Sequence, residues 1–208
     1  MDRQKEILRI LEEIYGGSRS ALEYESMYQL LVAVILSAQT NDNQVNKITG
    51  RLFQLYPDAE AMSALEPEEL EPLIATCGLY KNKAKNIVAT SRILCREYGG
   101  VVPADREKLM QLPGVGRKTA NVVLAVGFGI PALAVDTHVQ RVSNRLGLVK
   151  STTPEQTEAQ LCALIPEEQW PDAHHWLIWH GRKLCAAQRP KCGQCPLAQL
   201  CPSVVEQA

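Results

Sequence analysis

Hydrophobic positions recur at helical spacing along nearly the whole sequence. One expected helix carries Ala120, Val123 and Leu124 on a single face. A later one carries Val139 and Val142 in the same way, as helices that face a core do. Glycines and prolines separate the helical segments, at Gly16, Gly17, Pro57, Gly78, Gly99, Gly100, Pro113, Pro131, Pro154 and Pro166. Because such residues end helices, we expect an all-α protein of about ten helices.

Signals for strands and for membrane spans are weak. Residues 101–103 and 132–135 have extended character, but both stretches are too short and isolated to form a sheet. The longest apolar run, residues 30–36, is far too short to span a bilayer and predicts a buried helix. Long linkers, low-complexity segments and clear internal repeats are absent from the sequence, so composition does not mark domain boundaries.

Composition is consistent with a compact protein, because 208 residues that are 46% hydrophobic can bury one large core or two modest ones. The net charge of -1 is bland for a nucleic-acid-binding protein, so such a function depends on how the charges are distributed. Acidic residues gather at 66–71 and 155–168, whereas the basic residues beside the motifs described below are Lys81, Lys83, Lys85, Arg117, Lys118, Arg182, Lys183, Arg189 and Lys191. We expect one basic face for phosphates, although each group alone could be a solvated helix surface.

Residues 112–116 read Leu-Pro-Gly-Val-Gly and predict a tight turn before a helix. The N–H groups of such a turn and of the first helical turn have no partners within the helix, so they favour an anion such as a DNA phosphate. The residues that we therefore expect to contact DNA are Leu112, Gly114, Val115, Gly116 and Arg117. A plain corner between two helices is the alternative.

Lys118 lies near the start of that helix, against the positive end of its dipole, where a surface lysine gains nothing. If the side chain is partly desolvated there, its neutral amine becomes available as a nucleophile toward a sugar C1′. Asp136 precedes another expected helix and could be an N-cap only. The functional alternative is a carboxylate that takes a proton from Lys118 and stabilises an oxocarbenium-like sugar. Together the two residues indicate chemistry on DNA.

Four cysteines lie close together near the end of the sequence, separated by six, two and five residues: Cys185, Cys192, Cys195 and Cys201. Prolines among them prevent a regular helix, as expected for a loop folded around a metal. From spacing alone, a four-cysteine zinc site competes with a [4Fe–4S] cluster. The other three cysteines are expected to be small core residues, namely Cys77, Cys95 and Cys162. A disulfide framework is disfavoured because seven is an odd count and no secretory signal is visible.

The motifs resemble the endonuclease III family of helix-hairpin-helix DNA glycosylases. The resemblance runs nearly end to end and is carried by the four clustered cysteines and by residues 30–49, 78–87, 112–123, 134–148 and 172–185. It implies two helical lobes with a helix-hairpin-helix motif and a C-terminal [4Fe–4S] cluster loop. The expected domains are a central helical domain, 22–132, and a cluster domain, 1–21 with 133–208.

The resemblance also implies a bifunctional DNA glycosylase and AP lyase. Lys118 would attack the sugar, Asp136 would be the essential carboxylate, and β-elimination would cleave the strand 3′ to the abasic site. The expected substrates are oxidised pyrimidines in double-stranded DNA, such as thymine glycol, and the expected enzyme is a cytoplasmic monomer. The four clustered cysteines would hold the [4Fe–4S] cluster in a structural role, with Arg189 and Lys191 of the same loop contacting DNA.

Gln39 and Leu79 are candidates for filling the gap that a base leaves when it is extruded from a duplex. The amide of Gln39 could bond the orphaned base, and Leu79 could insert between base steps. Turn statistics alone favour a helix-end contact for Gln39 and core packing for Leu79. In the family that this chain resembles, the matching positions intercalate. Asn41 stands where that family more often has Thr, which leaves the lesion preference less defined than the reaction class.

Three other interpretations compete with this one. An adenine-mismatch glycosylase of the same fold would lack a lysine at position 118 and carry a further C-terminal domain. A non-catalytic helix-hairpin-helix DNA-binding protein would explain the basic face but not Lys118 with Asp136, and a small electron carrier would not explain the long helical body. His174, His175 and His180 lack partners at ligand spacing, so we expect hydrogen-bonded interior residues.

Overall fold

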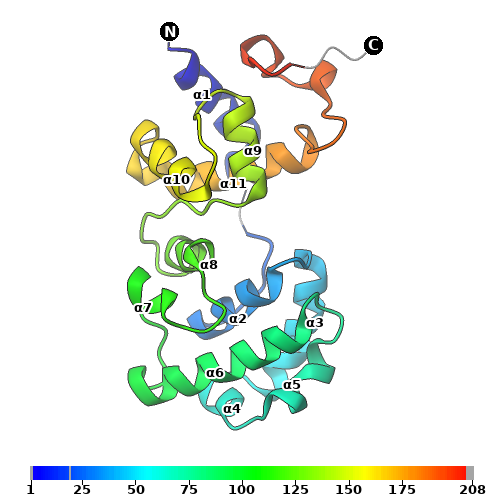
Figure 1. Cartoon of the computed structure of the whole chain (residues 1–208), viewed down its shortest axis with the longest axis vertical. Helices are drawn as coiled ribbons and strands as arrows, with labels where there is room; N and C mark the ends of the chain where they lie inside the picture. Colours follow the sequence, from blue (N-terminus) through cyan, green and yellow to red (C-terminus); the bar gives the residue numbers. More distant parts are fainter. Residues whose placement is uncertain (1, 19, 205–208) are drawn as a thin grey trace. The chain divides into compact units, whose positions relative to one another are not determined.

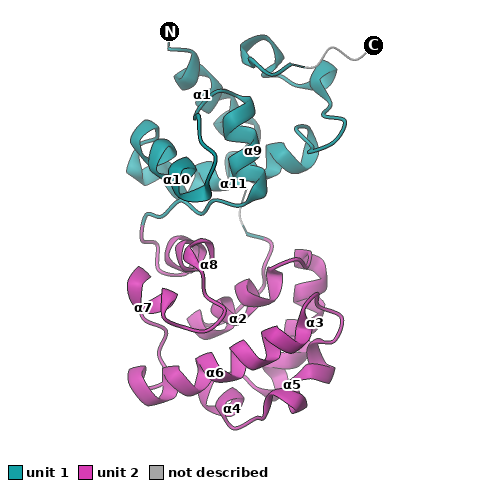
Figure 2. Ribbon diagram, viewed as in Figure 1, with its two compact units in different colours: residues 1–20, 131–208 teal, residues 21–130 magenta. Residues whose placement is uncertain are grey.

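The computed structural model describes residues 2–18 and 20–204. All regular structure within these two ranges is helical and includes no strand, which confirms the all-α prediction. None of the helices there is long and apolar enough to cross a membrane. The chain divides into two compact units, of which unit 1 comprises residues 1–20 and 131–208 and unit 2 comprises residues 21–130 (Figure 2).

Unit 2 is a continuous stretch of chain whose bounds are close to those expected for the central domain, 22–132. Its helices, labelled in Figure 1, are α2 (Met27–Ser37), α3 (Asp42–Leu55), α4 (Ala59–Ser63), α5 (Pro67–Ile74), α6 (Tyr80–Tyr98), α7 (Arg106–Met110), α8 (Arg117–Val122) and a π-helix (Val123–Gly127). The expected breaks at Pro57, Gly78, Gly99 and Pro113 all fall between these helices.

Helix α2 forms the centre of the unit 2 core and packs against α3, α6, α8 and the π-helix. Every residue from Tyr28 to Leu36 is buried, as expected of a helix that is apolar on nearly all sides. The π-helix approaches α2 at Gly127, where an added Cβ would lie 2.7 Å from Sδ of Met27 and 2.8 Å from Cδ2 of Leu30. The lack of a side chain at Gly127 therefore permits this close packing.

Helix α6 has 19 residues and packs along α4 and α5. It follows Leu79, whose backbone is left-handed, and ends before Gly99, which is also left-handed at φ 59°. Arg92, midway along the helix, donates hydrogen bonds to the carbonyl oxygens of Ser63 at 3.1 Å and Leu65 at 2.7 Å. Its guanidinium thereby satisfies acceptors at and just beyond the end of α4, where helical carbonyls lack partners.

Unit 1 joins the first helix to the last part of the chain. Its helices are α1 (Arg3–Tyr15), α9 (Thr137–Arg145), α10 (Pro154–Leu164), α11 (Trp170–Lys183) and three 3₁₀ turns, Glu167–Gln169, Cys192–Gln194 and Ala198–Leu200. Helix α11 packs against both α1 and α9, and Figure 1 shows these three side by side. Fully buried side chains of Ile7, Leu11, Val139, Val142 and Leu177 form the core between them.

The N-terminal helix is also tied to the end of the chain by hydrogen bonds. Nη1 of Arg3 donates to the carbonyl oxygens of Leu146 and Leu200, each at 2.9 Å, and Nη2 donates to that of Gly147 at 3.0 Å. One guanidinium thus joins α1, the end of α9 and the cysteine-rich segment. The five donors of an arginine fork suit such a junction.

Gly181 provides a test of the packing between α9 and α11. An added Cβ would lie 3.1 Å from His138 Cβ and 3.1 Å from Val142 Cγ2, both close to the backbone of α9. Overpacking of this kind costs roughly 1–3 kcal/mol, which exceeds the gain of up to about 1 kcal/mol that alanine brings to a helix. We therefore expect Gly181→Ala to lower the free energy of unfolding, measured in urea by far-ultraviolet circular dichroism.

Gly50 is the matched control, because it lies in helix α3 and an added Cβ would meet no atom within 4 Å. Gly50→Ala should raise the free energy of unfolding by about 0.5–1 kcal/mol through helix propensity alone. If both substitutions stabilise the protein, then Gly181 is not needed for close helix contact.

Candidate nucleic-acid interface and metal centre

The Leu112–Gly116 turn lies between α7 and α8, as the sequence predicted. Leu112 and Val115 are buried and anchor it in unit 2, whereas Gly114 is exposed with φ 77°. No side chain caps the first turn of α8, which begins after Gly116. The N-cap residue itself, a glycine, has no side chain that could accept from these backbone N–H groups.

Helix α6 supports this turn from behind. Oγ1 of Thr90 donates a hydrogen bond to the carbonyl oxygen of Pro113 at 2.9 Å. A Cβ on Gly114 would lie 2.9 Å from Nδ2 of Asn86, one turn earlier on the same helix. Gly114 therefore meets two requirements, a positive φ and the space for Asn86. Sequence reasoning missed both supporting residues, since polar side chains in mid-helix give no local signal of such contacts.

Lys118 is the second residue of α8, within the first turn as expected. Its side chain is exposed, so the condition of partial desolvation is not met in the chain without a ligand. The exposure leaves the ammonium group free to meet a ligand from solvent. The positive end of the helix disfavours a cation at that place.

Asp136 is the N-cap of α9. Its Oδ1 accepts hydrogen bonds from the backbone N–H groups of His138 and Val139, both at 2.8 Å. Both contacts use the same oxygen, so the cap fixes the carboxylate while Oδ2 is not engaged by any hydrogen bond recorded among the described residues. The capping interpretation is thus confirmed, and it does not exclude a chemical role for the second oxygen.

His138, next to the cap, packs against α11 at Gly181. Its Nδ1 lies 3.1 Å from Nη2 of Arg141. Because a guanidinium can only donate, Nδ1 must be the acceptor, which assigns the imidazole proton to Nε2. Burial lowers the pKa of His138, while the nearby Asp136 raises it. The neutral ring is consistent with the contact from Arg141.

Gln39, Leu79 and Arg189 are the non-glycine residues with positive φ in the described part of the chain, at 57°, 58° and 50°. All three were expected from the sequence to contact DNA. Residues other than glycine rarely adopt this backbone conformation, and where they do, the strained backbone commonly belongs to a functional site. Leu79 is 58% exposed, so the alternative of core packing for this residue is wrong.

The turns that carry Gln39 and Leu79 touch one another. A Cβ on Gly78 would lie 3.3 Å from the carbonyl oxygen of Gln39 and 3.7 Å from its Cβ. Gln39 is exposed and follows the end of α2, whose C-cap is Ala38. Nearby, the side chain of Asn41 accepts a hydrogen bond from Gln44 N–H at 2.9 Å and so caps α3. Asn41 is therefore a structural cap, a use for which asparagine is at least as suitable as threonine.

Lys83 corrects the expectation of a continuous basic face. Only 5% of this residue is exposed, and its Nζ donates to the carbonyl oxygens of Leu36 at 2.8 Å and Ala38 at 2.5 Å. A third contact reaches Oγ1 of Thr40 at 3.2 Å. Lys83 is consequently unable to contact phosphate. Its neighbours on either side, at 81 and 85, are exposed and stay in the predicted face.

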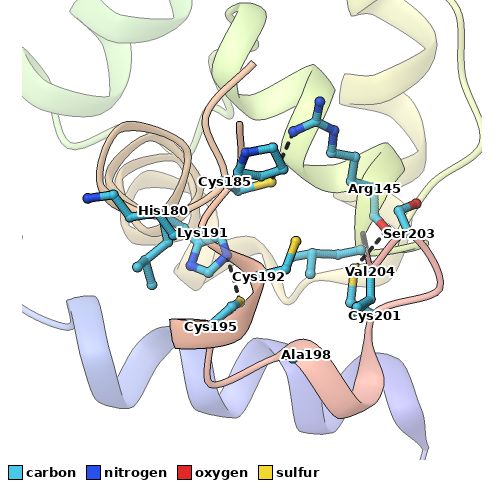
Figure 3. Close-up of a pocket in the computed structure, with 13 residues that line it drawn as sticks. Arg145, His180, Cys185, Lys191, Cys192, Cys195, Ala198, Cys201, Ser203 and Val204 are labelled. Carbon is cyan, nitrogen blue, oxygen red and sulfur yellow. Dashed lines mark hydrogen bonds between the residues drawn. The ribbon is translucent and has the colours of Figure 1, made fainter. Parts of the chain in front are cut away.

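The four clustered cysteines line one cavity of about 110 Å³ in unit 1 (Figure 3). The described residues include no group of three or more His, Cys, Asp or Glu that lies close enough together to hold a metal ion. The four cysteines surround this space. That arrangement, together with four sulfur donors, fits a group of several atoms such as an iron–sulfur cluster, which cysteine thiolates hold.

Two arginines on consecutive turns of α9 fix the chain around this cavity. Arg141 donates to the carbonyl oxygen of Cys185 at 3.0 Å, and Arg145 donates to those of Ala186 at 2.7 Å and Ala187 at 3.0 Å. Arg145 also lies 3.6 Å from Sγ of Cys185. Neither arginine was expected from the sequence to have this role, although their four-residue spacing places them on one helix face.

Burial shapes the chemistry of the cavity wall. His180 is buried, and desolvation lowers its pKa to about 4. Its Nδ1 lies 3.3 Å from the hydroxyl of Tyr15, and its Nε2 lies 3.7 Å from Sγ of Cys195. Burial also raises the pKa of the Cys195 and Cys201 thiols. Metal binding at these cysteines must therefore release protons.

The remaining histidines and the loop cations are also placed. His174 is buried with Nδ1 2.6 Å from the carbonyl oxygen of Ala134, as expected of an interior residue. His175 is half-buried, and its ring centroid lies 4.9 Å from that of His174. Arg189 and Lys191 are exposed on the cysteine loop, and Lys191 lines the cavity. Both cations are available to a partner from solvent.

Comparison with known proteins identifies the family. Residues 32–167 match the HhH-GPD superfamily base excision DNA repair proteins, and residues 185–201 match the iron–sulfur binding domain of endonuclease III. The chain is 52% identical to endonuclease III of Synechocystis sp., over 97% of this chain and 92% of that protein. It is 46% identical to endonuclease III of Escherichia coli K12, over 96% of this chain and 94% of that protein.

Solved structures agree with these relatives. A trapped endonuclease III–DNA covalent intermediate superposes with a TM-score of 0.93 at 45% identity, covering 98% of this chain and 97% of that one. A thermostable thymine-DNA glycosylase superposes with a TM-score of 0.85 at 26% identity, covering 97% of this chain and 96% of that one. The chain belongs to the endonuclease III family within the HhH-GPD superfamily of base excision DNA repair proteins.

Proposed function

We propose that this chain, a base excision repair DNA glycosylase and AP lyase that binds DNA, removes oxidised pyrimidines from duplex DNA as a cytoplasmic monomer. Lys118 is the nucleophile and Asp136 the essential carboxylate. The observation that carries the proposal is the exposed amine of Lys118 in the first turn of α8, directly after the Leu112–Gly116 turn. A relative that is 45% identical has been captured as a covalent intermediate with DNA, which supports a nucleophile on the protein.

The proposed reaction begins when Nζ of Lys118, having lost a proton, attacks C1′ of the damaged nucleotide. A bond forms between Nζ and C1′ while the glycosidic bond breaks, and the base leaves with the bonding electrons and gains a proton. The nitrogen lone pair then forms a C1′=N bond as the C1′–O4′ bond breaks, and O4′ takes up a proton from solvent, which gives a protonated imine. Loss of a C2′ proton then expels the 3′ phosphate by breaking the C3′–O bond, and the strand is cut.

Lys83 is another lysine near these turns, and burial lowers its pKa, which is a property of nucleophilic lysines. Its geometry nevertheless excludes it, because its Nζ is buried and hydrogen-bonded to three oxygen acceptors. Lys118 is exposed and can reach a ligand. Bound DNA would cover this amine and remove water from it.

Asp136 acts through the oxygen that the helix cap does not use. The two hydrogen bonds to Oδ1 hold the carboxylate in one orientation, so Oδ2 is presented without further ordering. A fixed negative charge stabilises an oxocarbenium-like sugar as the base departs.

Gln39 and Leu79 enter the duplex where the damaged base leaves the stack.

The iron–sulfur centre is of the [4Fe–4S] type, and we propose that Cys185, Cys192, Cys195 and Cys201 are its ligands. Bound there, it supplies cross-links that hold the cysteine loop in one conformation. Arg189 and Lys191 are thereby presented to DNA phosphates. Arg141 and Arg145 keep the loop backbone against α9 through its carbonyl oxygens.

Substitution at the two catalytic positions tests the mechanism. Lys118→Ala should bind an oligonucleotide containing thymine glycol but form no borohydride-stable crosslink with it. Asp136→Asn keeps an oxygen for the helix cap, so it should fold normally and yet lose base-removal rate by roughly 10²-fold or more. Single-turnover gel assays measure both effects.

Lys150→Ala, an exposed lysine of unit 1, is the control for Lys118→Ala and should crosslink normally. A crosslink with Lys118→Ala would mean that another amine is the nucleophile. Near-normal turnover by Asp136→Asn would leave Asp136 as a cap alone. Wild-type protein that ignores thymine glycol but excises adenine opposite 8-oxoguanine would reverse the substrate assignment.

Substitution of Arg145 tests the metal centre without changing any of the four cysteines. We expect about four irons per wild-type chain, measured by plasma emission spectroscopy, and no zinc. Arg145→Met keeps the alkyl stem but loses the bonds to Ala186 and Ala187, so it should release iron faster to a chelator. Arg9→Met, on the surface of α1, should retain iron as wild type does. Equal release of iron from both variants would show that the hydrogen bonds from Arg145 are not needed to retain the iron.

The loop cations give a salt-dependence prediction. Each phosphate contact contributes about one unit to the slope of log affinity against log salt. Arg189→Glu with Lys191→Glu should therefore weaken DNA binding at low salt and reduce that slope by about two, without changing iron content. Fluorescence anisotropy with labelled duplex DNA measures the slope. An unchanged slope would remove these two cations from the DNA interface.

A further inference from the structure

Lys83 joins the two turns that carry Gln39 and Leu79. Its ammonium donates to Leu36 and Ala38, at the end of α2, and to Thr40 just beyond. Gln39 lies between these last two acceptors in the sequence. These three hydrogen bonds, which we call the Lys83 clamp, therefore hold the backbone on both sides of Gln39, whose φ is 57°.

The backbone of Lys83 reaches the other turn. Its N–H donates to the carbonyl oxygen of Leu79 at 3.1 Å, which closes the first turn of α6. Leu79 itself has φ 58° and no side-chain cap. A single residue thus bonds the turn of Gln39 through its side chain and the turn of Leu79 through its main chain. Gly78 lies between the turns, where an added Cβ would make a tight contact of 3.3 Å with the carbonyl oxygen of Gln39.

The energetics of this arrangement differ from ordinary core packing. A lysine is almost never buried without a partner, and the recorded acceptors of Lys83 are two carbonyl oxygens and one hydroxyl. These three acceptors match its three donors, and the negative end of the α2 dipole compensates its charge. An apolar side chain of similar length would fill the same space without desolvating a charge. The polar clamp instead specifies where the loop backbone lies, which apolar packing does less well.

We propose that Lys83 is a positioning residue that fixes Gln39 and Leu79 relative to one another, so that both enter the gap left by an extruded base. This inference rests on the proposed function. Misplacement of a contacting group by about 1 Å can cost 10²-fold in rate. Reactions that need no extrusion, such as β-elimination at an abasic site in a single strand, should not require the clamp.

Lys83→Met tests the proposal, because methionine retains the apolar stem and removes every donor. We expect it to lower excision of thymine glycol from duplex DNA about tenfold or more, while single-strand AP lyase activity changes less than about twofold. A duplex with 2-aminopurine opposite a tetrahydrofuran site reports insertion directly by fluorescence. The fluorescence change on binding saturating enzyme should fall in the variant.

Arg92→Met is the matched control for stability. Arg92 lies on the same helix and likewise donates to carbonyl oxygens near a helix end, but it contacts α4 and its following turn, not the Gln39 turn. Its loss should reduce thermal stability and leave both the fluorescence change and the ratio of the two activities as in wild type. If Arg92→Met and Lys83→Met lost the fluorescence change and duplex excision to the same extent, the proposal would be overturned, because general destabilisation would then explain both results.

Thr40→Val keeps the proposal testable if Lys83→Met fails to fold, since it removes one of the three acceptors with little change of shape. Thr40→Val should lower duplex excision and the fluorescence change by a smaller factor than Lys83→Met does. A combination with Gln39→Ala and Leu79→Ala gives the decisive comparison. If Lys83 acts through these residues, adding Lys83→Met or Thr40→Val to that background changes duplex excision little, and multiplicative losses overturn the proposal.

Failure of the substrate assignment would look different. Wild-type protein would then leave thymine glycol in place. The fluorescence change of 2-aminopurine opposite the tetrahydrofuran site would still be smaller with Lys83→Met than with wild type. An unchanged fluorescence response in Lys83→Met, with active wild-type enzyme, would refute the positioning role and leave the proposed function intact.

Discussion

The rigidity of helix α6 is the constraint on which the proposed DNA-contacting surface of unit 2 depends. Leu79 immediately precedes the helix, Lys83 clamps the end of α2 from its first turn, and Thr90 holds the Leu112–Gly116 turn farther along. Because an α-helix rises about 1.5 Å per residue, these attachments are spaced along one stiff rod. The contacts of α6 with α4 and α5 keep that rod in place.

In unit 1 the corresponding problem is a loop that has little regular structure of its own. Backbone carbonyls in such a segment need donors when they are not in contact with water. Arg3, Arg141 and Arg145 supply many of them, from α1 and α9. The proposed cluster ligands are therefore held by a scaffold of guanidinium groups as well as by the chain that carries them. Basic residues near a motif can thus serve the fold and not the nucleic acid.

Local patterns predicted much of this molecule. Glycine and proline positions located the helix boundaries, and the sequence before α9 identified Asp136 as a cap. The strain at Gln39 and Leu79 has no sequence signature, since neither residue type favours a left-handed backbone. The resemblance to a family indicated these positions, and turn chemistry alone did not.

The burial of Lys83 could not be predicted, because its acceptors lie more than forty residues away in the sequence. Lysine is usually a surface residue, so composition placed it with Lys81 and Lys85. For Lys118 the sequence left partial desolvation as a condition only, and the residue is exposed. Both cases depend on how distant segments cover a side chain, which periodicity within one helix does not report.

The packing of α1 against α11 constrains the order in which the chain can fold during synthesis. Unit 2 is one continuous stretch, residues 21–130, and all of its partners are available once that stretch has left the ribosome. Helix α1 is made before unit 2 but has to wait, with Ile7 and Leu11 uncovered, until more than a hundred further residues have emerged. The bond from Arg3 to the carbonyl oxygen of Leu200 can form only after residue 200 has been made. A helix that is made before unit 2 is thus buried after unit 2 is complete.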